Sequence, residues 1–167
     1  MEGLVTTICL TAYALGWANA EQVCLNADTI VEVSERYDIQ PEIIVSLVYH
    51  ESRWNPRARS RAGACGLTQV LPKWTRNPRR TCSELMDNPE ISLDTGAKML
   101  YAFLNSKRYA DGNLKVALCA YNAGYSNCKS YRTKRRSNTY GRKVIRTSKT
   151  FREKMLSFDP EGEDEVF

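Results

Sequence analysis

Apolar residues at helical spacing, broken at short intervals, are the feature that most constrains the fold of this chain. The spacing predicts helices over residues 26–37, 41–51, 88–104, 113–123 and 138–155, with Pro, Gly, Asn or Asp at or near their ends. The sequence has no clear run in which apolar and polar residues alternate, and no internal repeat. We therefore expect a mainly α-helical chain with little strand.

Length and composition narrow the class of protein. The 167 residues fit one domain of ordinary size. Hydrophobic residues at 43% and charged residues at 26% exclude collagen-like, wholly disordered and multi-span membrane proteins. The net charge of +5 is concentrated between Lys129 and Lys154, where eleven basic residues accompany one acid, and this span indicates an anionic partner or a solvated face. The acidic segment 157–167 is expected to be disordered.

The first twenty residues differ from the rest of the chain. Residues 4–17 carry no charge, and Ala18-Asn19-Ala20 has the small-x-small pattern that a signal peptidase cleaves. We therefore predict that residues 1–20 are a signal peptide, that cleavage falls before Glu21, and that residues 21–156 form the mature domain. A retained anchor and a buried helix are the alternatives, because the segment before the apolar run carries Glu2 and no Lys or Arg.

Six cysteines fit an exported protein, because structural disulfides persist in oxidising compartments. Cys9 lies inside the predicted signal peptide. Its removal leaves an odd number of disulfide candidates: Cys24, Cys65, Cys82, Cys119 and Cys128. The pairs Cys65–Cys82 and Cys119–Cys128 are close in sequence, but Cys24 could bond to any of the others, so the connectivity stays open and one thiol is left over.

The sequence predicts neither a metal site nor a cofactor. It contains no Cys-x-x-Cys pair and its single histidine is His50, so the ligand spacing of a zinc site is missing. A thiol dyad of Cys65 and His50 lacks a third group to orient it, and no phosphate-binding glycine loop of the Walker type occurs.

One carboxylate is placed where its chemistry should be unusual. In the predicted helix 41–51, the apolar residues Ile44, Leu47 and Val48 share a face with Glu51, at spacings i, i+3, i+4 and i+7. A carboxylate at the end of an apolar stripe is disfavoured in its charged form, which raises its pKa and makes it a candidate general acid. The alternative is a solvated glutamate paired with a neighbour such as Arg53.

Three short motifs in a fixed order carry a family resemblance. The first is His50-Glu51-Ser52 followed by Trp54-Asn55-Pro56, the second runs from Ala62 to Val70, and the third is Ala120-Tyr121-Asn122-Ala123-Gly124. A fourth, weaker match places Tyr140 and Val144 on the last predicted helix. Together, over residues 28–145, they resemble the catalytic domain of soluble lytic transglycosylases, lysozyme-like enzymes that cut the glycan strand of peptidoglycan.

The resemblance implies a fold and a reaction. The fold is a single, compact, mainly helical domain of the α+β lysozyme-like superfamily. The reaction is cleavage of the MurNAc-β-1,4-GlcNAc bond with formation of a 1,6-anhydromuramoyl end, in which Glu51 acts first as acid and then as base, without a second carboxylate. Two alternatives remain: a hydrolytic lysozyme of the goose type, and a non-catalytic glycan-binding or assembly component that keeps the fold.

The resemblance also assigns substrate contacts to six further residues: Ser52, Gln69, Thr68, Tyr121, Asn122 and Tyr140. Two departures from the family pattern stand out. Thr68 replaces the usual Met beside the substrate, and residues 135–139 contain no acid where the family often has a Glu.

Each of these residues also has a local explanation. A hydroxyl such as that of Ser52 can bond to the backbone of its own helix, and Gln69 can be an ordinary loop amide. Tyr121 and Asn122 precede Gly124, a natural helix end, and Tyr140 could be a core tyrosine that contacts Glu51, the sugar or neither.

The implied partner is the peptidoglycan glycan strand, with a secretion, conjugation or phage assembly as a further partner. No nucleic acid is expected, and membrane contact is expected only through the signal segment. The implied location is periplasmic or extracellular, or in the virion for a phage protein.

Overall fold

The structure is a computed structural model that describes residues 2–108, 110–128 and 139–158. Within these residues the regular secondary structure is helical, apart from isolated β-bridges that join Cys65 to Arg59 and to Val70. This confirms the expected mainly α-helical class. The elements, in order, are α1 (Glu2–Ala14), α2 (Ala20–Leu25), α3 (Ala27–Tyr37), α4 (Pro41–Ser52), the 3-10 turn η1 (Pro72–Trp74), α5 (Cys82–Asp87), α6 (Pro89–Leu104), α7 (Leu114–Ala123), α8 (Tyr125–Cys128) and α9 (Thr139–Leu156).

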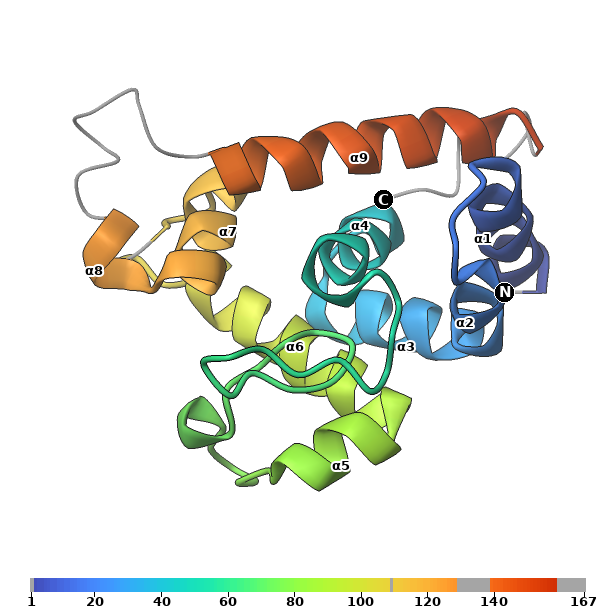
Figure 1. Cartoon of the computed structure of the whole chain (residues 1–167). Coiled ribbons are helices and arrows are strands. Elements are labelled where there is room, and N and C mark those ends of the chain that lie inside the picture. Colours follow the sequence, from blue (N-terminus) through green and yellow to red (C-terminus); the bar gives the residue numbers. More distant parts are fainter. Residues whose placement is uncertain (1, 109, 129–138, 159–167) are drawn as a thin grey trace.

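Helix α4 forms the centre of the fold, with the other helices arranged around it and α9 crossing over it (Figure 1). Its residues from Glu42 to Val48 are all buried, as expected for a helix that is apolar on most of its surface. The buried Glu42 at its first turn lies 4.0 Å from Arg152 of α9, so an ion pair joins the two helices. Burial raises the pKa of Glu42, and the Arg152 charge opposes that rise.

The helix ends follow the sequence signals closely. The side chain of Asn88 accepts the backbone N–H of Ile91 at the start of α6, and Asn113 does the same at the start of α7. Helix α5 is an element that the sequence prediction missed. It begins at a reciprocal capping box between Thr81 and Glu84, and it is too short to show an apolar period.

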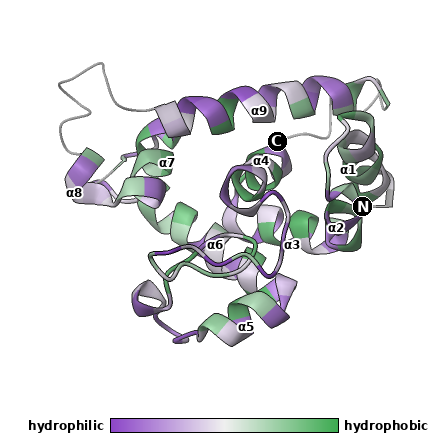
Figure 2. Cartoon of the chain, in the orientation of Figure 1, coloured by the Kyte–Doolittle hydropathy of each residue, from purple (hydrophilic) through white to green (hydrophobic). Residues whose placement is uncertain are grey.

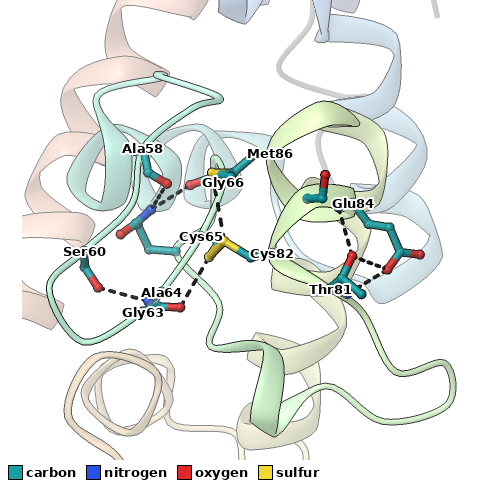
Figure 3. The surroundings of a disulfide bond; sticks show 12 residues. Ala58, Ser60, Gly63, Ala64, Cys65, Gly66, Thr81, Cys82, Glu84 and Met86 are labelled. Carbon is teal, nitrogen blue, oxygen red and sulfur yellow. Dashed lines mark hydrogen bonds between the residues drawn. A yellow bond between two sulfur atoms is a disulfide. The ribbon is translucent and has the colours of Figure 1, made fainter.

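The Cys65–Cys82 disulfide holds the loop between α4 and α5 (Figure 3). Backbone hydrogen bonds also hold it, such as those from Cys65 to Val70 at 3.1 Å and from Gly66 to Ala58 at 3.0 Å. Gly66 in this loop has a φ of +77°, and a Cβ there would lie 2.1 Å from the carbonyl oxygen of Leu85. Only glycine fits that approach, so the loop packs directly against α5.

The N-terminal segment is folded as α1 and packs against α2, α3 and α9. Figure 2 shows hydrophobic residues along α1 and hydrophilic residues along much of α9. Ile8 and Ala12 of α1 are fully buried. This structure contains residues 1–20, so its packing describes the chain before any cleavage. The removal of residues 1–20 stays a prediction. In the described part of the chain, no helix is both long and apolar enough to cross a membrane.

All six cysteines are paired in the chain that retains its first residues. The pairs Cys65–Cys82 and Cys119–Cys128 confirm the two local predictions. Cys24 pairs with Cys9, so the expected leftover thiol does not occur in this chain. Residues 135–138 and most of the acidic segment 157–167 lie outside the described residues.

Candidate active site

Glu51, in the last turn of α4, lies in surroundings that favour its protonated form. Burial raises the pKa of its carboxyl group to about 7. A hydrogen bond that Oε1 accepts from the Tyr140 hydroxyl offsets part of this rise. The alternative pairing with Arg53 is not found among the described residues, because the Arg53 guanidinium lies 4.1 Å from the ring centre of Tyr49 instead. The prediction of a perturbed carboxylate is therefore confirmed.

Two tyrosines from distant parts of the chain surround Glu51. Tyr140 is supplied by the first turn of α9, and Tyr121 by the third motif on α7. The pKa of each phenol is raised far above its ordinary value, chiefly by burial and then by the Glu51 charge. Both stay protonated at neutral pH and act as hydrogen-bond donors. The predicted contact between Tyr140 and Glu51 is confirmed, and Tyr121 donates to the carbonyl oxygen of Thr68 at 2.7 Å.

Thr68 does not present its side chain to a ligand. The side chain is 1% exposed, and its hydroxyl donates to the carbonyl oxygen of Ser92 on α6 at 2.8 Å. Gly96, one turn further along α6, makes room for it, since a Cβ there would lie 2.4 Å from the Thr68 methyl group. The shorter threonine that replaces the family's Met thus turns into the helix packing. The expected side-chain contact with substrate is corrected on this point, and Thr68 serves the site through its carbonyl oxygen.

Gln69 ties the glycine-rich loop together. Its amide nitrogen donates to the carbonyl oxygens of Ala58 and Gly66, each at 3.0 Å. Figure 3 shows these two loop residues beside the Cys65–Cys82 disulfide. With both N–H groups engaged, the side-chain oxygen is the group left to accept a hydrogen bond from a ligand. The predicted loop-amide role is therefore present, and the substrate role stays a prediction.

Two predicted substrate residues remain, Ser52 on α4 and Asn122 on α7. Ser52 is half-buried, and its hydroxyl donates to the carbonyl oxygen of Val48 at 3.3 Å, which matches the local explanation. Asn122 is exposed on α7, two residues before the helix ends at Gly124. The Nε2 atom of His50 lies 2.8 Å from the Thr147 hydroxyl, so His50 joins α4 to α9.

The sequence analysis missed the residues whose contacts fix the positions of Thr68 and His50. Ser92 and Gly96 position Thr68, and Thr147 positions His50. A weak signal exists for the first pair, since two small residues one turn apart predict a helix face that admits a close neighbour. No local signal marks Thr147, because its partner lies 97 residues earlier in the chain.

The site offers a single perturbed acid and no metal ligands among the residues described. Burial raises the pKa of Glu51 and the Tyr140 hydrogen bond lowers it, and among the described residues no second charged group is a cause of the shift. No group of three or more His, Cys, Asp or Glu side chains in residues 2–108, 110–128 and 139–158 is placed to hold a metal ion. The arrangement can hold a proton on Glu51 near neutral pH and deliver it to a basic oxygen.

Comparison with known proteins gives consistent matches. The profile of the family described as "Transglycosylase SLT domain" matches residues 28–144. A transglycosylase of Enterobacteria phage PRD1 is 34% identical over 97 residues, which cover 58% of this chain and 34% of that protein. The membrane-bound lytic murein transglycosylase E of Buchnera aphidicola is 30% identical over 109 residues, which cover 60% of this chain and 48% of that protein.

A solved structure shares the fold. The lytic transglycosylase Slt of Pseudomonas aeruginosa, an inactive mutant, superposes with a TM-score of 0.59 at 19% identity, over 95% of this chain and 30% of that chain. At that identity the likeness shows the fold alone. The chain therefore spans about a third to a half of the length of these curated relatives, and about a third of the solved chain.

Proposed function

We propose that this chain, which belongs to the Transglycosylase SLT domain family, is a peptidoglycan lytic transglycosylase that cleaves the MurNAc-β-1,4-GlcNAc bond. The observation that supports this most directly is Glu51, whose pKa of about 7 keeps a proton available at neutral pH. It stands in the family's first motif, and tyrosines of the third and fourth motifs lie around it.

The proposed reaction has two proton transfers. Glu51 donates its proton to the glycosidic oxygen as the bond to the anomeric carbon of MurNAc breaks, which releases the GlcNAc hydroxyl. The ionised Glu51 then takes the proton of the muramoyl C6 hydroxyl while that oxygen attacks the anomeric carbon. The products are a 1,6-anhydromuramoyl end and a regenerated acid. The Tyr140 hydroxyl supports the ionised state between the two steps, because it donates to the carboxylate.

The electrostatics of Glu51 favour this reaction over one that needs two carboxylates. Two carboxyl groups about 5 Å apart, as in retaining glycosidases, perturb each other's pKa strongly. Among the residues that the structure describes, no such partner contributes to the pKa of Glu51. The hydrolytic alternative differs in the acceptor, which is water in place of the C6 hydroxyl. The non-catalytic alternative has no use for an acid with a pKa near neutrality.

The test is mass spectrometry of the soluble muropeptides that the full chain releases from purified sacculi. The matched control is Glu51→Gln, which keeps the size and the acceptor for Tyr140 but cannot donate a proton. We expect anhydromuropeptides from the unaltered chain and none from the control. Reducing-end muropeptides would instead establish the lysozyme alternative, and binding to sacculi without release by either protein would establish the non-catalytic one.

The proposed location is outside the cytoplasm, where peptidoglycan and disulfides both occur. The Cys65–Cys82 and Cys119–Cys128 disulfides, which do not depend on residues 1–20, support it. A secretion, conjugation or phage assembly is the further partner that we propose, because a compact glycan-cleaving domain suits local opening of the wall. Detection of the protein in an oxidised form in a periplasmic or virion fraction tests the location.

A further inference from the structure

A crevice lies between the loop that follows α1, helix α4 and helix α9. Its volume is about 250 Å³, below the usual range of about 300 to 1,000 Å³ for sites that enclose drug-sized ligands. It therefore suits a small group or the end of a chain. The lining combines apolar, aromatic, hydroxyl and cationic side chains: Leu15, Trp17, Tyr49, Arg146, Thr147 and Thr150.

The aromatic side chains that line the crevice are held in place by ring contacts. Trp17 stacks on Tyr49 with ring centres 4.2 Å apart, and it also packs against Phe151 of α9, which is fully buried. The stacked rings are thereby fixed between α4 and α9. A rigid aromatic wall with hydroxyls opposite can bind a small ligand at little cost in side-chain entropy.

The crevice and its approach are positively charged. Arg146 is one of the lining residues. The Arg53 guanidinium lies over the ring of Tyr49, the residue on which Trp17 stacks. Burial is the main cause of the lowered pKa of His50, and the charges of Arg53, Lys143 and Arg146 lower it further, which places all three cations near that residue. Within the described residues, none of these three cations forms an ion pair with an acidic side chain. The local field therefore favours an anionic ligand.

The distance from Glu51 fits the chemistry of the proposed substrate. Thr150 lies ten residues after Tyr140 on α9, which is about 15 Å along the helix axis. His50 and Thr147 form a hydrogen bond between these two points. The muramic acid of a peptidoglycan strand carries a short acidic peptide stem, and a stem of about five residues spans about 17 Å when extended. A stem that leaves a muramoyl residue at Glu51 can therefore reach the crevice.

We propose that this crevice, in the chain that keeps residues 1–20, binds the carboxylate end of the substrate's peptide stem, with Arg146 as the pairing cation and Trp17 and Tyr49 as the apolar wall. The inference rests on the proposed function for the identity of its ligand. It gives the basic face of α9 a role in substrate selection: strands that carry stems are bound more tightly than bare strands. Arg146 is a specificity residue in this scheme and takes no part in bond cleavage.

The direct test is a titration of the full chain, as its Glu51→Gln variant, with a free stem pentapeptide and with the same peptide as a C-terminal amide. Binding is followed by the indole resonance of Trp17, assigned with Trp17→Phe. We expect the acid to shift this resonance and to bind at least about tenfold more tightly than the amide, because a charge-assisted hydrogen bond is lost. Equal affinity for the two peptides, or no shift with either, would overturn the inference.

Two variants separate a specific pairing from the general charge of α9. Arg146→Met removes the cation and keeps an unbranched apolar side chain, whereas Lys149→Met removes a neighbouring exposed cation outside the lining. We expect Arg146→Met to weaken binding of the acid about tenfold, and Lys149→Met to change it less than twofold. Equal losses in both variants would show a diffuse charge effect and would refute the assigned site.

Kinetics on two substrates distinguish failure of this inference from failure of the proposed function. Arg146→Met should raise KM about tenfold on strands that carry stems and leave cleavage of strands stripped of stems by an amidase unchanged. The same loss on both substrates contradicts the inference while the function stands. If the unaltered chain cleaves neither substrate, the function fails, and the peptide titration alone still decides whether the crevice binds a carboxylate.

Discussion

The hydrogen bond from Tyr140 to Glu51 allows the sharpest test of how this site is tuned. Tyr140→Phe removes the phenol hydroxyl and keeps the ring in the same packing. The hydroxyl donates to Oε1 and favours the ionised carboxylate, so its loss must raise the pKa of Glu51 above about 7. The shift is upward because the lost hydrogen bond stabilises the ionised form of Glu51.

The size of the shift follows from the bond that is removed. A hydrogen bond to a charged group contributes about 1.5 to 3 kcal/mol, and about 1.4 kcal/mol corresponds to one pKa unit. Because a water molecule can partly replace the hydroxyl, we expect the lower end of this range. The pKa of Glu51 should therefore rise by about one unit.

The assay is the pH dependence of strand cleavage. Glu51 must be protonated to act as the acid, so kcat/KM falls as the pH rises through its pKa. In Tyr140→Phe this falling limb should move to higher pH by about one unit, while the maximal rate decreases because the ionised intermediate state has lost a donor. Tyr37→Phe is the matched control, since the Tyr37 hydroxyl donates to the Asp94 carboxylate at 2.9 Å at another place in the fold.

Two results would refute this reasoning. If the alkaline limb stays in place in Tyr140→Phe, the hydrogen bond does not set the pKa of Glu51. If Tyr37→Phe moves the limb by the same amount, the shift reports a general loss of packing. A direct titration of the Glu51 carboxyl carbon by NMR removes the dependence on turnover.

Three further predictions concern stability and packing. The folded chain holds the Glu51 proton up to about pH 7, whereas an unfolded chain releases it near pH 4.5. Glu51 therefore does not change the free energy of unfolding below pH 4.5, and it lowers that free energy by about 3 kcal/mol above pH 7. Glu51→Gln should therefore be more stable than the unaltered chain by about that amount at pH 8 and equally stable at pH 4, as measured by urea unfolding; a gain that is independent of pH would contradict the linkage. Gly96→Ala places a Cβ against Thr68 and should destabilise the chain by about 1 to 3 kcal/mol, as measured by the urea midpoint. Ala97→Gly, at the neighbouring buried position, is the control. A chain that begins at Glu21 lacks the Cys9–Cys24 bond and the buried Ile8, and should unfold at a lower urea concentration, with a loss of at least about 3 kcal/mol; equal midpoints for the two chains would show that α1 contributes nothing.

The local features of this protein follow from its sequence. The helices at Pro41, Pro89 and Leu114 begin where Pro and Asn predict, because caps and apolar periods depend on residues within one or two turns. The candidate general acid follows in the same way, since the apolar stripe that ends at Glu51 is a property of one helix. The two local disulfides also need only short loops between their cysteines.

The assembly of the site depends on contacts between distant segments. Tyr140 lies 89 residues from Glu51, and no local pattern distinguishes it from a core tyrosine. The direction of Thr68 depends on the space that Gly96 leaves on another helix, and that space exists only after α6 packs against the loop.

The N-terminal segment shows the same limit most clearly. An uncharged, apolar stretch is compatible with export, with membrane insertion and with burial. Its composition gives its hydrophobicity but does not say whether a membrane or another part of the protein will cover it. In the structure α1 meets α3 and α9, which brings Trp17 onto Tyr49 and Cys9 to Cys24. The sequence by itself therefore determined helices α3, α4, α6, α7 and α9, their ends to within about one residue, and the candidate acid Glu51. The tertiary structure decided which side chains surround that acid, because packing between helices sums many weak long-range contacts that no local window contains.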